Sequence, residues 1–147
     1  MGRKLRYLPE EGALVEVTCR TLQGRLLLRP NPELNDIAAG VLGRAQRLYP
    51  VEIIAWVLLS NHYHMIVRTE SAKRLARFVG YFNSNLAREV SRLTGWTGKI
   101  WDRRYQSILI SNEEDVQVAR FRYVPALGFF WHLFLLGPAP SSEYNEC

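Results

Sequence analysis

VEIIAWVLLSNHYHMIVRT, residues 51–69, contains two apolar runs separated by Ser60-Asn61. The first run, residues 51–59, is rich in β-branched and aliphatic side chains, which is typical of a buried strand. The Ser60-Asn61 pair suits a short turn, and residues 62–69 then continue as a second run of strand composition. This stretch therefore predicts two paired antiparallel strands in the middle of a sheet.

A third strand is predicted upstream, over residues 13–21, where apolar and polar side chains alternate. Val15 and Val17 fall on one face of this segment, and Glu16 and Thr18 fall on the other. The alternation predicts a strand with one buried face and one polar face.

Two amphipathic helices are predicted, one before and one after the strand pair in the sequence, because apolar residues recur at steps of three and four. The first helix stops before Pro50. Its apolar positions are Leu34, Ile37, Ala38, Val41, Leu42, Ala45 and Leu48. Ser71 is a suitable N-cap for the second helix, residues 72–93, and Gly95 ends it. A fourth, short strand over residues 106–110 follows.

The predicted order of elements is β-α-β-β-α-β-α, with a last helix beginning after Asn112. This order predicts an α+β, ferredoxin-like fold, in which an antiparallel sheet carries its helices on one face. The length of 147 residues fits one domain, and 48% hydrophobic residues with 22% charged residues is typical of a globular protein. Cys19 and Cys147 are the only cysteines, and residues 1–11 lack the apolar core of a secretory signal. We therefore expect a cytoplasmic protein that does not associate with a membrane.

Positive charge is concentrated in the second half of the predicted domain. The whole chain carries a net charge of +5, but residues 68–104 alone carry nine basic and three acidic side chains, a difference of +6. The basic ones are Arg68, Lys73, Arg74, Arg77, Arg88, Arg92, Lys99, Arg103 and Arg104. Such a segment favours nucleic acid as the partner, and the alternative is a basic helix face that is simply solvated.

His62 and His64 are the most specific chemical signal in the sequence. Because side chains alternate along a strand, both imidazoles are expected on one face, close enough to share one metal ion. Two neutral imidazoles make an incomplete site, so a third protein ligand has to come from elsewhere, with water or phosphate oxygens completing the shell. The alternative is a pair of half-buried strand histidines bonded to the backbone.

Four segments resemble elements of the REP-associated tyrosine transposases, single-tyrosine HUH enzymes that act on single-stranded DNA. Residues 59–67, LSNHYHMIV, resemble the HUH signature strand, and residues 81–85, YFNSN, resemble part of the long helix. Residues 99–107, KIWDRRYQS, and residues 122–124, RYV, resemble the loop and the helix that follow. The matching elements occur in the family's order and cover residues 13–124. We expect residues 1–124 to form the transposase-like domain.

The resemblance implies a mechanism and assigns roles to three residues. Tyr123 matches the nucleophile that attacks a phosphodiester and becomes a 5′-phosphotyrosine, and His62 and His64 match the metal ligands. The metal implied is Mg²⁺ or Mn²⁺, and the implied substrate is single-stranded DNA with hairpin or palindromic repeats. Tyr105 is the alternative nucleophile, although the family has a structural aromatic residue there. A monomer and a homodimer are both compatible with the resemblance.

A further set of residues is expected to hold the DNA strand. It combines the basic side of the second helix with the loop that follows: Lys73, Arg74, Arg77, Arg88, Arg103, Arg104 and Trp101. Cations would contact phosphates, and Trp101, with Trp96, could stack on unpaired bases. The alternative for each tryptophan is a packed anchor of the loop.

The resemblance ends after Val124. A typical member has Asn or Gln one turn after the tyrosine, which completes the metal site, whereas this chain has Leu127 there and Pro125 before it. Residues 125–147 are thus a divergent segment, apolar at first and then of disordered composition. A frameshifted gene end, a divergent packed helix and an exposed interaction segment all remain open, and we favour the first. The alternative function is a non-catalytic remnant that still binds single-stranded DNA.

Overall fold

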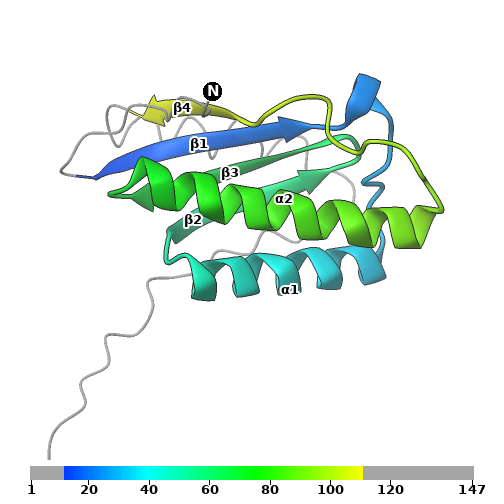
Figure 1. The fold of residues 1–147 in the computed structure, drawn as a ribbon, viewed down its shortest axis with the longest axis horizontal. Coiled ribbons are helices and arrows are strands. Elements are labelled where there is room, and N and C mark those ends of the chain that lie inside the picture. Colours follow the sequence, from blue (N-terminus) through cyan, green and yellow to red (C-terminus); the bar gives the residue numbers. More distant parts are fainter. Residues whose placement is uncertain (1–11, 111–147) are drawn as a thin grey trace, which may run out of the picture.

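The computed structural model describes residues 12–110, which form one antiparallel sheet of four strands with two helices on one of its faces (Figure 1). The elements are β1 (Ala13–Arg20), the 3-10 turn η1 (Leu22–Gly24), α1 (Pro32–Leu48), β2 (Glu52–Leu59), β3 (His62–Thr69), α2 (Ala72–Thr94) and β4 (Gln106–Ile110). The strand order across the sheet is β2-β3-β1-β4. No helix within residues 12–110 combines the length and the apolar character needed to cross a membrane.

This topology confirms the predicted α+β, ferredoxin-like fold. β3 pairs antiparallel with both β1 and β2, so β1 and β2 run parallel with β3 between them, which is the split β-α-β arrangement. β4 pairs antiparallel with β1 at the edge of the sheet. The sequence did not predict η1, and the helix predicted after Asn112 lies outside the described residues.

The helix ends follow from local hydrogen bonds that their sequences provide. The Oδ1 atom of Asn31 accepts from the backbone N–H of Leu34 at 2.8 Å and caps α1. Ser71 caps α2 in the same way, since its Oγ accepts from the N–H of Arg74 at 3.2 Å. Gly95, with φ of 71°, ends α2 in the left-handed conformation that a glycine adopts without a Cβ clash.

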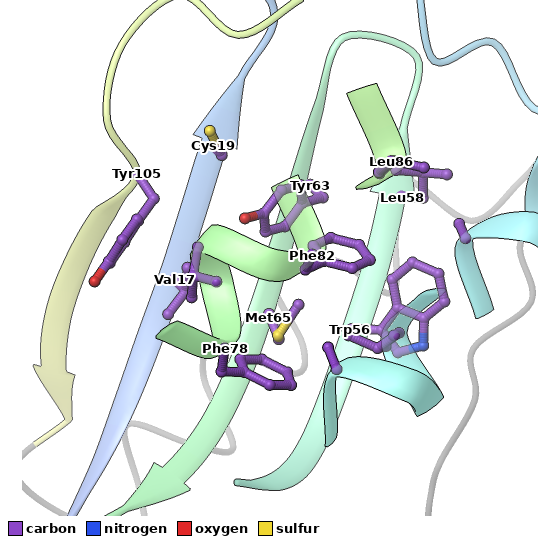
Figure 2. Packing of buried hydrophobic residues seen from close by; sticks show 14 of the residues in the cluster. Val17, Cys19, Trp56, Leu58, Tyr63, Met65, Phe78, Phe82, Leu86 and Tyr105 are labelled. Atoms are coloured by element: carbon purple, nitrogen blue, oxygen red, sulfur yellow. The ribbon is translucent and has the colours of Figure 1, made fainter. Parts of the chain in front are cut away.

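The hydrophobic core lies between the sheet and the two helices (Figure 2). Val15, Val17, Tyr63 and Met65 point into it, and each is at most 1% exposed. α2 contributes its apolar face from the other side, with Leu75, Phe78, Val79, Phe82, Leu86 and Val90 buried. Burying each large apolar side chain contributes roughly 1.5–3 kcal/mol, so a slip of one residue in β3, which would bury the histidines in place of Tyr63 and Met65, is strongly disfavoured.

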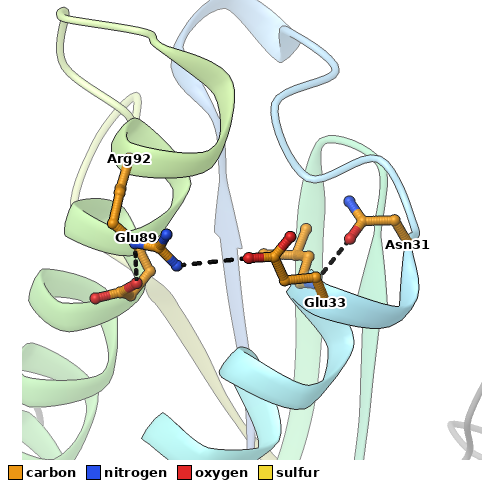
Figure 3. Close-up of polar contacts among 5 residues, drawn as sticks. Asn31, Glu33, Glu89 and Arg92 are labelled. Atoms are coloured by element: carbon orange, nitrogen blue, oxygen red, sulfur yellow. Dashed lines mark hydrogen bonds and ion pairs between the residues drawn. The ribbon is translucent and has the colours of Figure 1, made fainter.

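One of the basic residues of α2 connects the two helices. Arg92 lies 2.9 Å from Glu89 on its own helix and 3.7 Å from Glu33 at the start of α1, beside the cap residue Asn31 (Figure 3). The side chains of Arg92 and Glu33 are 58% and 64% exposed, so the pair contributes little to stability. It shows that Arg92 serves contacts within the helical layer.

Candidate functional site

The side chains of the two histidines lie together on the face of the sheet opposite the helices. His62 and His64 are the first and third residues of β3, and their ring centroids lie 4.9 Å apart with planes at 80°. On β1, Arg20 and Thr18 stand directly across from His62 and His64, respectively. The prediction that both imidazoles share one face is confirmed.

A pocket of about 330 Å³ lies over these rings. It is lined by Thr18, Cys19, Arg20, His62, His64, Asp102, Arg103, Arg104 and Gln106. The loop between α2 and β4 reaches the pocket because it is hydrogen bonded to the end of β1 and to η1. The N–H of Asp102 donates to the carbonyl of Arg20 at 3.0 Å, and the N–H of Leu22 donates to the carbonyl of Ile100 at 2.7 Å. The pocket therefore combines residues distant in sequence.

His62 is oriented by the turn that precedes it. The amide Nδ2 of Asn61 donates to the carbonyl of Gly24 at 3.2 Å, which turns Asn61 Oδ1 toward His62. The Nδ1 atom of His62 lies 2.6 Å from this oxygen. Because an amide oxygen only accepts, Nδ1 carries the proton and Nε2 of the neutral ring carries the lone pair.

The Nδ1 atom of His64 contacts two side chains of β1. Its Nδ1 lies 2.9 Å from the hydroxyl of Thr18 and 3.2 Å from a carboxylate oxygen of Glu16. The side chains of His64 and Glu16 are only 16% and 18% exposed. The carboxylate oxygen of Glu16 only accepts, whereas the hydroxyl of Thr18 can donate or accept.

Both histidines are held in the neutral form. Burial, with smaller contributions from the nearby His64 and Arg20, lowers the pKa of His62 to about 4. Burial also lowers the pKa of His64 and outweighs the opposing effect of Glu16, so the contact with Glu16 is a hydrogen bond from a neutral ring rather than an ion pair. Neutral imidazoles are the form that binds metal ions, so the two residues fit as two ligands of a divalent cation.

The described residues do not supply a third metal ligand. Within residues 12–110, no group of three or more histidine, cysteine or acidic side chains is placed to hold a metal ion. Water or phosphate oxygens, or residues beyond 110, would have to complete the coordination shell.

Three arginines and one aspartate line the pocket and give it a net positive charge; the aspartate, Asp102, lies 3.3 Å from Arg103. Arg103 and Arg104, both expected to hold DNA, line it, and the exposed Arg20 joins them. Sequence analysis missed Arg20. The signal was present, since Arg20 continues the alternation of Glu16 and Thr18 along the polar face of β1.

Comparisons with known proteins agree with this architecture. The model of the family described as "Transposase IS200 like" matches residues 30–125. The chain belongs to the IS200-like transposase family. A comparison of this chain with curated proteins found no significant match.

Two solved structures share the fold of this IS200-like family member. One is a REP-associated tyrosine transposase bound to a REP hairpin, with 20% identity, a TM-score of 0.58, and coverage of 86% of this chain and 74% of that one. The other is a protein from Deinococcus radiodurans R1, provisionally assigned as a transposase, with 15% identity, a TM-score of 0.55, and coverage of 84% and 97%. At these identities the likeness concerns the fold.

The cations of α2 are not brought together with the histidines of this IS200-like chain. Lys73, Arg74, Arg77 and Arg88 are all exposed, and none lines the pocket. The apolar side of α2 packs on the core face of the sheet, so its basic side lies in the helical layer, away from the histidine face. A contact between these four residues and DNA stays a prediction, and it would involve a different surface.

The tryptophans of the loop before β4 are engaged within the protein. The indole N–H of Trp101 donates to the carbonyl of Asn83 at 2.9 Å, and its ring meets that of Tyr63 edge-on at 5.6 Å. Trp96 donates to the carbonyl of Lys99 at 3.2 Å, with the guanidinium of Arg25 over its ring at 4.7 Å. Both contact other parts of the protein, and base stacking by Trp101 or Trp96 stays a prediction.

Sequence analysis missed a buried polar network beneath the histidines. The hydroxyl of Tyr63 donates to Oδ1 of Asn83 at 2.7 Å, and Nδ2 of Asn83 lies 3.6 Å from the sulfur of Cys19. Burial raises the pKa of Tyr63 well above its ordinary value. The network joins β1, β3 and α2 directly behind the site. It gives Asn83, the first asparagine of the YFNSN segment, a structural role.

The two tyrosines considered as nucleophiles have different outcomes. Tyr105 is buried at 6% exposure in the core cluster, near Val17 and Cys19 in Figure 2, and it does not line the pocket. Tyr123, together with Pro125 and Leu127, lies outside the described residues.

Proposed function

We propose that this chain is a DNA strand transferase that cuts and rejoins single-stranded DNA through Tyr123. The observation that carries the proposal is the pair of neutral imidazoles on β3, opening together into a pocket with three arginines. Membership of the IS200-like transposase family supports it. A likeness in fold to a transposase that binds a REP hairpin suggests DNA with a hairpin as the substrate class.

In this proposal, the pocket binds the scissile phosphate. Arg20, Arg103 and Arg104 would bind its oxygens, since a guanidinium can donate two parallel hydrogen bonds to a phosphate. His62 and His64 would hold Mg²⁺ or Mn²⁺ through their Nε2 atoms. A divalent ion bound there would supply Lewis acidity toward a phosphate oxygen.

The reaction itself is a transesterification. The hydroxyl oxygen of Tyr123 attacks phosphorus, the bond from phosphorus to the 3′ oxygen breaks, and the tyrosine proton passes to that leaving oxygen by way of solvent. The products are a 5′-phosphotyrosine and a free 3′-hydroxyl. A second 3′-hydroxyl can reverse the step and rejoin the DNA without hydrolysis.

The test uses a hairpin oligonucleotide with single-stranded flanks. We expect the full chain to form a covalent adduct with it in the presence of Mg²⁺ or Mn²⁺, visible on a denaturing gel. Tyr123→Phe should abolish the adduct. Tyr81→Phe is the matched control, because it removes a hydroxyl from α2 on the far side of the sheet. An undiminished adduct with Tyr123→Phe would exclude this nucleophile.

A second candidate function is binding of single-stranded DNA without cutting. It is motivated by Leu127 and Pro125, which replace the polar residue and the continuous helix expected after the tyrosine, and by the lack of a third ligand within residues 12–110. Salt-sensitive binding of the same oligonucleotide without an adduct would select it. Loss of binding at low salt would exclude both candidates.

A further inference from the structure

We infer that Glu16 is a positioning residue for His64: its carboxylate fixes the tautomer and the orientation of the ring, so that Nε2 is the metal-binding nitrogen. The functional side of this inference rests on the proposed metal site. The tautomer itself is a property of the metal-free protein and can be tested separately.

The hydrogen bonds of His64 single out Glu16. Nδ1 of His64 contacts two oxygens, that of Thr18 at 2.9 Å and that of Glu16 at 3.2 Å. A hydroxyl can donate or accept, so Thr18 is compatible with either tautomer. A carboxylate oxygen only accepts, so Glu16 is compatible only with a proton on Nδ1. Of these two partners, Glu16 therefore decides the tautomer.

The environment of Glu16 calls for hydrogen-bond partners for its carboxylate. It lies on β1 directly across from Ile66, which is 3% exposed, and its own side chain is 18% exposed. A carboxylate shielded from water beside an apolar side chain is costly unless it is hydrogen bonded, and a β-branched residue would suit this strand position better. The contact with Nδ1 of His64 at 3.2 Å is one hydrogen bond that compensates for this burial.

Glu16 also makes the two histidines chemically unequal. Nδ1 of His62 faces the neutral amide oxygen of Asn61, whereas Nδ1 of His64 faces a carboxylate. A carboxylate on the remote nitrogen raises the basicity of the metal-binding nitrogen and locks the ring orientation. We therefore expect His64 to be the stronger ligand of the pair, and Glu16 to set that difference.

The first experiment measures binding of Mn²⁺ alone to the full chain by calorimetry. Glu16→Leu should weaken binding by about 10–100-fold, because it removes the acceptor. Glu16→Gln keeps the shape and one acceptor oxygen, so it should weaken binding by a smaller factor. Glu52→Gln is the matched control: it removes a carboxylate that pairs with Arg68 rather than a histidine, and it should change the affinity by less than about twofold.

The second experiment reads the tautomer of His64 from its ring nitrogen shifts by NMR in the metal-free protein. The wild type should show the proton on Nδ1, and Glu16→Leu should lose this preference while His62 keeps its own. A proton on Nε2 of His64 in the wild type, or Mn²⁺ affinity unchanged in Glu16→Leu, would overturn the inference. If the wild type does not bind Mn²⁺ at all, the tautomer still decides, and that failure counts against the proposed function instead.

Discussion

Substitutions of Tyr63 and Asn83 should have coupled effects on stability, because the two side chains share a hydrogen bond. A double-mutant cycle measures this coupling energy directly. Tyr63 is fully buried, and its hydroxyl donates to Oδ1 of Asn83 at 2.7 Å. Tyr63→Phe leaves that oxygen without its donor, and Asn83→Leu leaves the buried hydroxyl without its acceptor. Each single change should cost about 1–3 kcal/mol, which is the range for an unsatisfied buried polar group.

The double variant separates this hydrogen bond from general disruption of the core. With Tyr63→Phe and Asn83→Leu together, both members of this hydrogen bond are removed and only the weak contact of Asn83 with the sulfur of Cys19 is lost in addition, so the loss should fall well below the sum of the single losses. The assay is urea unfolding, in which a loss of 2 kcal/mol lowers the midpoint by about 1 M. Tyr81→Phe serves as the control, with an expected loss under about 0.5 kcal/mol. Additivity of the two changes within about 0.5 kcal/mol would refute the reasoning.

Two further predictions concern the pocket. Burial, with smaller effects of His64 and Arg20, lowers the pKa of His62 from 6.5 to about 4. The unfolded chain therefore takes up a proton at His62 before the folded protein does, so the free energy of unfolding is unaffected above pH 6.5 and decreases as the pH falls toward 4. The urea midpoint of the wild type should therefore fall more steeply between pH 7 and about pH 4.5 than that of His62→Asn, and equally steep curves would contradict the assignment. Arg20→Gln should weaken binding of single-stranded DNA for all sequences and reduce the salt slope by about 1, whereas Arg44→Gln on α1 should not. Equal slopes for both variants, measured by fluorescence anisotropy, would show that Arg20 makes no phosphate contact.

The strands and helices were predictable because each has a clear local signal. β3 has the predicted bounds, since the Ser60-Asn61 turn marks its start and the alternation of Tyr63, Met65 and Val67 sets its buried face. The ends of α2 follow from Ser71 and Gly95. The turn η1 was missed because it depends on Gln23, whose φ of 55° no local pattern indicates.

The position of the cations of α2 shows what the periodicity of a single helix can predict and what it cannot. The helical pattern correctly separates the apolar from the basic side of α2, but it does not say which face of the sheet the helix covers. The answer was implicit in β3: Tyr63 and Met65 form the apolar side, so helices on that side must leave His62 and His64 on the other. Combining the two patterns would have placed the basic side of α2 away from the site.

The contacts that tune the histidines could not be predicted from local sequence. Glu16 reaches His64 only because β1 and β3 pair in one register, with Thr18 opposite His64. Asn61 reaches His62 in a fixed orientation because the carbonyl of Gly24, far along the chain, binds its amide. Both depend on how separate segments meet, and this information is absent from the periodicity of any single segment.

The described half of the site is preformed, because β3 is an inner strand held by neighbours on both sides and by a core beneath it. Side chains on such a strand are positioned more accurately than side chains on loops. Both candidate functions use this part of the site, and which of the two applies depends on residues beyond 110, among them Tyr123 and Leu127. Changes there should alter cutting while leaving the tautomers of His62 and His64 and the charge of the pocket intact, so binding and cutting can be separated by experiment.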